Sequence, residues 1–228
     1  MRIVDIFKSK QGEGIWTGEE SAFIRVVGCN LRCVFCDTQY ASWRPEEGED
    51  LTIEEVAGRI LLLDCKHVVL TGGEPMLYSE MIPLTRLLKE MNYILTIETS
   101  GTLELPVVCD LMSISPKLSN STPKDASPSL VRFHETNRAR PDIIRHLIRL
   151  YNYQIKFVID EPEDLLEAEE FLAMFEEIDP KRVLFMPLAT DVSAMWSKAE
   201  WIVSFCRNRG YQYCPRKQLE WYGNRRRT

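Results

Sequence analysis

The stretch GCNLRCVFCDTQY, residues 28–40, decides how the rest of this sequence is interpreted. It places three cysteines, Cys29, Cys33 and Cys36, close together at the spacing C-x3-C-x2-C. The other cysteines, Cys65, Cys109, Cys206 and Cys214, are scattered along the chain. The first three border apolar segments, and we expect them to act as small buried hydrophobic residues.

The composition is that of a globular protein of ordinary size. The 228 residues are 45% hydrophobic and 27% charged, and we expect residues 1–228 to form a single domain. A formal net charge of −6 argues against a general nucleic-acid surface. The one sharp charge run, Arg225–Arg227, is expected to be a solvated end, with ligand binding as the alternative.

No stretch approaches the ~18 to 20 apolar residues of a membrane span. The first residues, MRIVDIFKSKQGEG, do not resemble a secretory signal. We therefore expect a cytoplasmic protein whose cysteines stay reduced and form no disulfide framework.

Apolar runs typical of strands alternate with amphipathic patterns typical of helices, which predicts an α/β fold with a parallel sheet, open or curled into a barrel. Expected strands are 2–7, 22–27, 67–71, 94–98, 111–115, 153–159 and 182–188. Expected helices start after a capping box at Thr52 and Glu55, and then cover 79–92, 141–151, 163–178 and 193–210. Residues 117–140 break this alternation and are expected to form a long lid, binding loop or mobile segment.

Unusual loops follow four neighbouring strands of this prediction. The cysteine loop follows 22–27, TGGEP (71–75) follows the next strand, and TSGT (99–102) and SPK (115–117) follow the two after that. Active sites in parallel α/β folds gather at the carboxyl ends of the strands. We therefore expect these four loops to share one site.

Three explanations compete for the cysteine loop. Unliganded thiols would not require such clustering. A structural zinc site needs four nitrogen or sulfur ligands, usually as two pairs, and no second pair follows, since the three histidines stand apart. An iron–sulfur cubane held by three thiolates would leave one iron open to a substrate or cofactor. The spacing favours this third explanation. The histidines are His67, His134 and His146.

The spacing, with Phe35 just before the last cysteine, resembles that of the radical S-adenosylmethionine superfamily. In that superfamily the open iron chelates S-adenosylmethionine, and one electron cleaves it to a 5′-deoxyadenosyl radical that abstracts hydrogen from the substrate. TGGEP resembles the superfamily's glycine-rich loop, in which Gly73 lets the backbone approach the cofactor and Glu74 offers a carboxylate to its ammonium group.

Further motifs resemble one family within that superfamily, the 7-carboxy-7-deazaguanine synthases. They are QGEG (11–14), IETSGT (97–102), SISPKLSNS (113–121), IKFVI (155–159) and QLEWYGNRRRT (218–228), so the resemblance covers nearly the whole chain. It implies conversion of 6-carboxy-5,6,7,8-tetrahydropterin to 7-carboxy-7-deazaguanine with loss of ammonia, on the way to queuosine and other deazapurines. It also implies a [4Fe-4S] cluster, S-adenosylmethionine, Mg²⁺, a flavodoxin-type reductant, a homodimer, and a partial (β/α)6-type barrel with shortened or lost helices.

The resemblance assigns residues to this site. Cluster ligands would be Cys29, Cys33 and Cys36, and Thr38 would bind Mg²⁺. Residues implied to bind S-adenosylmethionine are Phe35, Asp37, Gly73, Glu74, Ser115, Pro116, Lys117 and Lys156. Residues implied to bind the pterin are Lys10, Gln11, Gly12, Glu13, Arg25 and Thr71.

Plainer roles compete with several of these assignments. QGEG could be a polar turn, and Arg25 could form a structural salt bridge. Thr38 could cap a loop, and Lys156 could point from a strand end into solvent.

The chain also departs from the family at its C-terminal end. Glu220 stands where members often have a histidine, and Thr228 follows three arginines where members place a terminal carboxylate in the site. Two other functions remain open on the sequence alone: an activase that makes a glycyl radical on a partner protein, and a non-catalytic zinc or iron module.

Overall fold

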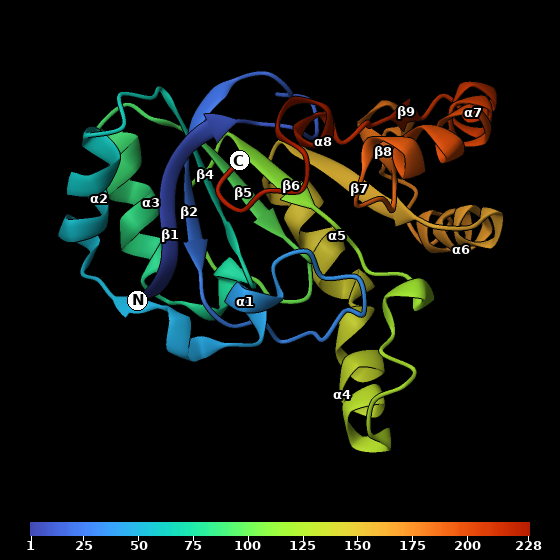
Figure 1. Ribbon diagram of the computed structural model, residues 1–228, viewed down its shortest axis with the longest axis horizontal. Helices are drawn as coiled ribbons and strands as arrows, with labels where there is room; N and C mark the ends of the chain where they lie inside the picture. The colour runs from blue at the N-terminus through green and yellow to red at the C-terminus, as the bar shows by residue number, and fades with distance from the viewer.

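All strands of the computed structural model, which describes residues 1–228 apart from the side chain at position 45, belong to one sheet of nine strands (Figure 1). The strand order is β3-β1-β2-β4-β5-β6-β7-β8-β9. The strands are β1 (Arg2–Lys10), β2 (Glu20–Val26), β3 (Glu49–Asp50), β4 (His67–Gly72), β5 (Ile94–Thr99), β6 (Leu111–Ile114), β7 (Tyr153–Ile159), β8 (Val183–Pro187) and β9 (Gln212–Tyr213).

From β2 to β9 every neighbouring pair is parallel, whereas β1 pairs antiparallel with β2 and β3. The antiparallel start follows from the chain, because β1 and β2 are joined by a loop without the helix that a parallel crossover needs. The predicted α/β fold with a parallel core is confirmed, and each of the seven predicted strands is present.

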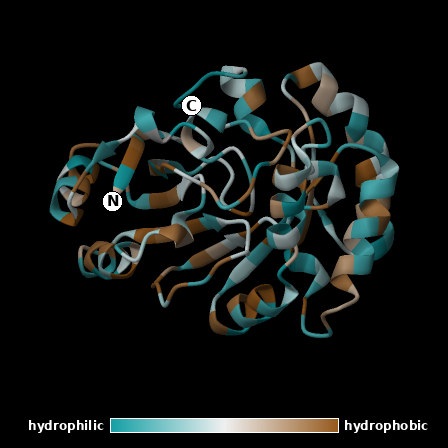
Figure 2. Cartoon of the chain, turned by 90° about the horizontal axis from the view of Figure 1, so that it is seen from below, coloured by the Kyte–Doolittle hydropathy of each residue, from teal (hydrophilic) through white to brown (hydrophobic). Residues whose placement is uncertain are grey.

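The helices are α1 (Gln39–Ser42), α2 (Ile53–Leu61), α3 (Met81–Glu90), α4 (Pro128–Arg138), α5 (Pro141–Leu150), α6 (Pro162–Leu172), α7 (Val192–Arg209) and α8 (Lys217–Tyr222). The helices α3, α5, α6 and α7, which follow β4, β6, β7 and β8, pack on one face of the sheet (Figure 1). They carry apolar and polar residues side by side in Figure 2, as expected of helices with one buried face. The capping box at Thr52 and Glu55 is present, and the last long helix ends before Gly210 as predicted.

The prediction of a long loop over residues 117–140 is wrong in its second half. Residues 128–138 form helix α4, with the Ser127 hydroxyl accepting a hydrogen bond from the Leu130 amide and Pro128 in the first turn. These are ordinary helix-start signals. They are easily overlooked because α4 lacks a broad apolar stripe and buries only His134.

The two faces of the sheet differ in polarity. Side chains alternate between faces along a strand, and the parallel register aligns them from strand to strand. One such aligned row is apolar, fully buried and covered by the helices; it consists of Ile24, Leu70, Ile97 and Met112. The opposite face, which we call the inner face, carries the site.

The scattered cysteines only partly follow the prediction. Cys206 is buried in the main core, but Cys65 and Cys109 are half-buried at its margin. Cys214 is buried and packs with Leu184 and Met186 of β8. Among the helices of the described chain, none is long and apolar enough to cross a membrane.

Candidate active site

A row of polar side chains crosses the inner face from β1 to β7, and we call it the polar row. The strand registers bring Asp5 opposite Arg25, Arg25 opposite Thr71, Glu98 opposite Ser113, and Ser113 opposite Gln154. The Thr71 hydroxyl closes the remaining gap by donating a 3.0 Å hydrogen bond to Glu98. Buried charged groups are costly unless they are paired, so the charges of this row must pair with one another or with a ligand.

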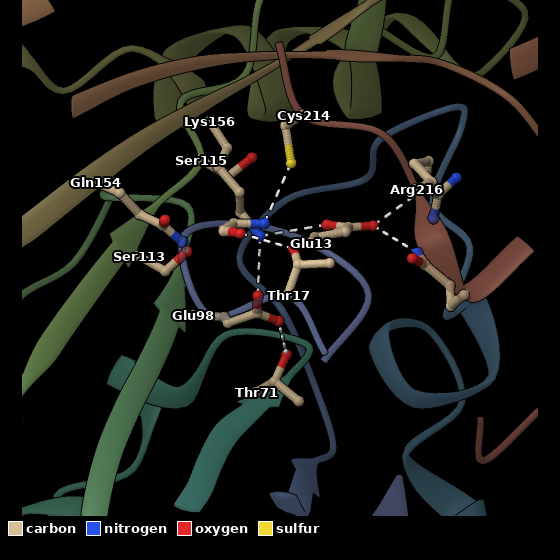
Figure 3. Close-up of polar contacts among 12 residues, drawn as sticks. Glu13, Thr17, Thr71, Glu98, Ser113, Ser115, Gln154, Lys156, Cys214 and Arg216 are labelled. Carbon is tan, nitrogen blue, oxygen red and sulfur yellow. Dashed lines mark hydrogen bonds and ion pairs between the residues drawn. The ribbon is translucent and has the colours of Figure 1, made fainter. Parts of the chain in front are cut away.

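The Lys156 side chain comes from β7, and its ammonium group lies between Glu13 and Glu98 (Figure 3). It is 4% exposed, so the alternative that it points into solvent is wrong. Its ammonium group lies 2.9 Å from the Glu98 carboxylate and 3.2 Å from that of Glu13. Burial alone would lower the pKa of Lys156, but the two carboxylates outweigh burial and raise the pKa. The lysine is therefore a fixed positive charge.

Glu13 is the meeting point of the N-terminal and C-terminal segments (Figure 3). Besides Lys156, its carboxylate accepts hydrogen bonds from Arg216 at 3.1 Å and from Gln218 at 2.6 Å. Burial alone would raise the pKa of Glu13, but Lys156 and Arg216 outweigh it and lower the pKa to about 2. Arg216 also donates to Asp37 at 2.7 Å, which links the QGEG loop to the cysteine loop.

The QGEG loop is therefore more than a polar turn. The Gln11 amide group donates to Ser21 at 2.9 Å, and the Ile15 backbone N–H donates to Gln154 at 2.9 Å. A Cβ atom at Gly12 would lie 2.1 Å from the Gln218 side chain, so only glycine allows the two segments to meet this closely. Lys10 is different: it is exposed at the end of β1, and the structure does not bring it to the other expected pterin ligands.

Sequence reasoning missed Glu98, Gln154, Arg216 and Gln218. Glu98 did carry a signal, since a charge ends an otherwise apolar strand. Arg216 and Gln218 reach the site only through the tertiary fold, 203 and 205 positions away from Glu13. The Glu220 carboxylate instead pairs with Lys217 at 2.7 Å within α8.

The three cysteines of the loop are free thiols, with Cys33 buried and Cys29 and Cys36 half-buried. Burial, reinforced by the nearby Glu74 carboxylate, raises the pKa of Cys29 to about 12. Such thiols ionise only against a strong positive charge, which ligated iron supplies. Among the described residues, no three His, Cys, Asp or Glu side chains gather around a point fit for a single metal ion. A cubane has four irons and does not require that convergence. The donor set thus fits a cluster.

Glu74 holds the glycine-rich loop together. Its carboxylate is fully buried and accepts hydrogen bonds from the hydroxyls of Thr99 and Ser100 at 2.8 and 2.6 Å. The amides of Ser100 and Met76 donate to the same carboxylate at 2.9 and 3.2 Å. These four donors take up the acceptor capacity of a carboxylate. The Glu74 carboxylate is thus fully hydrogen-bonded within the protein, which leaves the backbone of the glycine-rich loop to contact a cofactor.

Close backbone packing joins the glycine-rich loop to the cysteine loop. The Glu74 amide donates to the Gly28 carbonyl at 2.8 Å, one residue before the first cysteine. A Cβ atom at Gly73 would lie 1.7 Å from that same carbonyl oxygen, so a larger residue would push the two loops apart. The expected meeting of these loops is present.

The segment 117–140 supports the cysteine loop from the other side. His134 is fully buried on α4; its Nδ1 accepts from the Arg32 amide at 3.1 Å and its Nε2 lies 2.9 Å from the Ser121 hydroxyl. The Val34 amide donates to the Ser121 carbonyl at 2.8 Å. Through these hydrogen bonds the segment holds the cysteine loop in place.

Three further expected residues, Ser115, Lys117 and Thr38, make local contacts. The Lys117 ammonium folds back onto Ser115, 2.8 Å from its carbonyl and 2.7 Å from its hydroxyl. Thr38 makes no capping hydrogen bond at the start of α1, which leaves its predicted loop-capping alternative without support. Its hydroxyl lies 3.7 Å from the Cys36 sulfur.

Comparisons with known proteins agree with this geometry. The model of the radical SAM superfamily matches residues 23–156. A 7-carboxy-7-deazaguanine synthase of Rhodopirellula baltica is 44% identical over 99% of this chain and 88% of its own length. A synthase of Halobacterium salinarum is 34% identical over 94% and 87%.

The fold also has a solved counterpart. The crystal structure of QueE from Escherichia coli superposes with a TM-score of 0.71 at 23% identity, and covers 95% of this chain and 93% of that one. The cysteine loop, the glycine-rich loop and the full-length relatives lead to one conclusion: the chain belongs to the 7-carboxy-7-deazaguanine synthase family of the radical SAM superfamily.

Proposed function

We propose that this chain converts 6-carboxy-5,6,7,8-tetrahydropterin to 7-carboxy-7-deazaguanine with release of ammonia, a step toward queuosine and other deazapurines. The observation that carries the proposal is the charge cluster in which the partly exposed carboxylates of Glu13 and Glu98 flank the buried Lys156 ammonium, on the same inner face as Arg25. The cluster and Arg25 offer fixed charges of both signs to a flat heterocycle with a polar edge and a carboxylate. The sequence similarity to named synthases over nearly the whole chain supports the same reaction.

The three thiolates of the cysteine loop hold a [4Fe-4S] cluster in this proposal, and the loops after β2, β4 and β6 bind S-adenosylmethionine. When bound, these groups would supply one-electron reduction and the abstraction of a hydrogen atom from the substrate. Phe35, Asp37 and Pro116 border the cofactor. Gly73 approaches it through the backbone, while Glu74, Ser115 and Lys117 shape their loops through the contacts described above. Lys156 adds a positive charge beside it.

The pterin lies against the polar row in this proposal. Glu13 stays ionised at neutral pH, because its pKa is about 2, and accepts N–H groups from the aminopyrimidine edge. Gln11, Gly12 and Thr71 add polar contacts, and Arg25 pairs with the substrate carboxylate. Thr38 binds Mg²⁺ together with that carboxylate and water, the kind of oxygen set that Mg²⁺ keeps.

The physiological setting is inferred from the family resemblance. We propose a flavodoxin-type protein as electron donor, a homodimer as the working assembly, a cytoplasmic location, and no role for nucleic acid or membrane.

The test is turnover under anaerobic conditions. Reconstituted protein, dithionite, S-adenosylmethionine and Mg²⁺ are incubated with the carboxytetrahydropterin, and the new deazapurine chromophore and the released ammonia are measured. We expect Cys33→Ala to abolish product and Arg25→Ala to lower the rate at least about a hundredfold, as expected for lost electrostatic contacts at a reacting substrate.

Arg86→Ala is the matched control, because Arg86 is exposed on the outer helix α3. It should leave turnover within about twofold, as for surface substitutions generally. If the unmodified chain, with a full complement of iron and sulfide, makes no product, the proposed function is wrong.

A further inference from the structure

A second group of charges lies at the β1 edge of the polar row, around Asp5. Asp5 is 3% exposed, yet it faces groups from three separate parts of the chain. Its Oδ1 accepts from Arg227 at 2.6 Å and from Arg226 at 3.3 Å. Its Oδ2 accepts from the Tyr40 hydroxyl at 3.1 Å, just beyond the cysteine loop. Arg226 and Arg227 are exposed, as expected of a solvated end, but both also reach the buried Asp5 carboxylate.

The neighbour of Asp5 across the sheet is Arg25, and the two form only a long ion pair. The Arg25 Nε lies 3.8 Å from the Asp5 Oδ2, beyond hydrogen-bond distance. That nitrogen is buried and has no hydrogen-bond partner among the described residues. A buried guanidinium nitrogen without a partner is costly unless a ligand completes it.

The C-terminal tail is fixed where it can hold Asp5. Beyond α8 it returns across the sheet toward β1 and β2 (Figure 1). The Arg226 guanidinium stacks 3.9 Å from the centre of the Tyr40 ring and pairs with Glu47 at 3.0 Å. Both contacts are of the kind that arginine makes better than lysine.

The charges around Asp5 do not cancel. Three guanidinium groups, of Arg25, Arg226 and Arg227, pair with its one carboxylate. Arg226 also pairs with Glu47, but Arg44 shares that carboxylate at 3.9 Å. The positive charge with the loosest partner is that of Arg25. An anionic group of the substrate would balance it.

We propose that Arg226 and Arg227 are specificity-determining positioning residues for the carboxylate of the substrate. By occupying Asp5 they keep it from recruiting Arg25, so that the Arg25 guanidinium stays available for the substrate carboxylate. The inference rests on the proposed function. Without the two tail arginines, Asp5 would close onto Arg25 and the carboxylate would lose its partner.

Equilibrium dialysis of two pterins tests this assignment. Reconstituted protein with Mg²⁺ and S-adenosylmethionine is dialysed anaerobically against 6-carboxypterin or against pterin, which lacks the carboxylate, and free pterin is read by its fluorescence. We expect the Arg226→Ala/Arg227→Ala variant to bind 6-carboxypterin about tenfold more weakly, the scale of one charge-assisted hydrogen bond, and pterin with unchanged affinity.

Two further variants make the outcome specific. Adding Asp5→Asn to the double variant should restore binding of 6-carboxypterin, because Arg25 then has no competing carboxylate. Arg225→Ala is the control, since it removes the same charge from the same tail, and no contact of its side chain is seen among the described residues. It should match the unmodified chain.

Three results would overturn the inference: equal weakening for both pterins, an unchanged affinity for 6-carboxypterin in the double variant, or no recovery with Asp5→Asn. Equal binding of the two pterins by the unmodified chain would also overturn it. The turnover assay of the preceding section decides separately on the reaction, so a chain that makes product while its tail variants bind normally rejects this inference alone.

Discussion

At the scale of single residues, Glu13 makes the site sensitive to acid. Its pKa, lowered to about 2, lies below the ordinary value of 4.5, so its ionised form favours the folded state. That contribution is complete above the unfolded pKa and is lost as pH falls through about 4.5 toward 2. Acidification should therefore erode the stability supplied by the contacts of Glu13 with Lys156 and Arg216.

Urea unfolding of the unmodified chain and of Glu13→Gln measures this effect. As the pH is lowered from 6 to about 3, the unmodified chain should lose unfolding free energy relative to Glu13→Gln. Unfolding lets Glu13 take up a proton in this pH range, whereas the glutamine of the variant takes up none. Glu176→Gln serves as the control for an exposed carboxylate. A difference that stays constant over this range would contradict the assignment of Glu13 as a stabilising anion.

At the scale of elements, α4 and the cysteine loop depend on one another through His134. Its Nδ1 accepts a hydrogen bond from the Arg32 amide of the loop. The ring is therefore neutral, and its Nε2–H donates to the Ser121 hydroxyl. Burial lowers the pKa of His134, which favours the same neutral form. Replacing the ring would leave the Arg32 amide without its partner at the base of the thiol loop.

We expect His134→Ala to lose about 1–3 kcal/mol of unfolding free energy, the cost of an unsatisfied buried donor, and to retain less iron after anaerobic reconstitution. His146→Ala is the matched control, because His146 is exposed and pairs only with Glu104. Iron and sulfide per chain are measured together with urea unfolding. Full iron content and normal stability in His134→Ala would show that α4 does not buttress the loop.

The sequence predicts elements better than it predicts contacts between them. The apolar runs predict β2 and β4, and the motif after each places the cysteine loop and TGGEP at one end of the sheet. That Glu98 would share a face with Thr71 depends on register, which no local pattern specifies. Arg216 could not be assigned at all, because its partners come from the other end of the chain.

At the scale of the whole molecule, the C-terminal segment ties the two site-forming loops together. The Lys217 amide donates to the Gly12 carbonyl at 2.9 Å, the Gly14 amide donates to the Cys214 sulfur at 3.1 Å, and Arg216 bridges Glu13 and Asp37. These contacts span nearly the full chain. Because the site is assembled from both ends of the chain, we propose that residues 1–228 form one domain.

Hydrogen exchange tests this long-range link through Arg216→Met, which removes the bridging charge and keeps an apolar stem of similar length. We expect backbone amides of residues 11–18 and 212–222 to lose protection together, since each segment holds the other, while β4–β6 keep theirs. Arg209→Met is the control: it breaks an exposed pair with Glu169, worth about 0–1 kcal/mol, and should leave both segments protected. If only residues 212–222 opened in Arg216→Met, the QGEG loop would be held by β2 and β7 alone, and the C-terminal segment would cover the site without organising it.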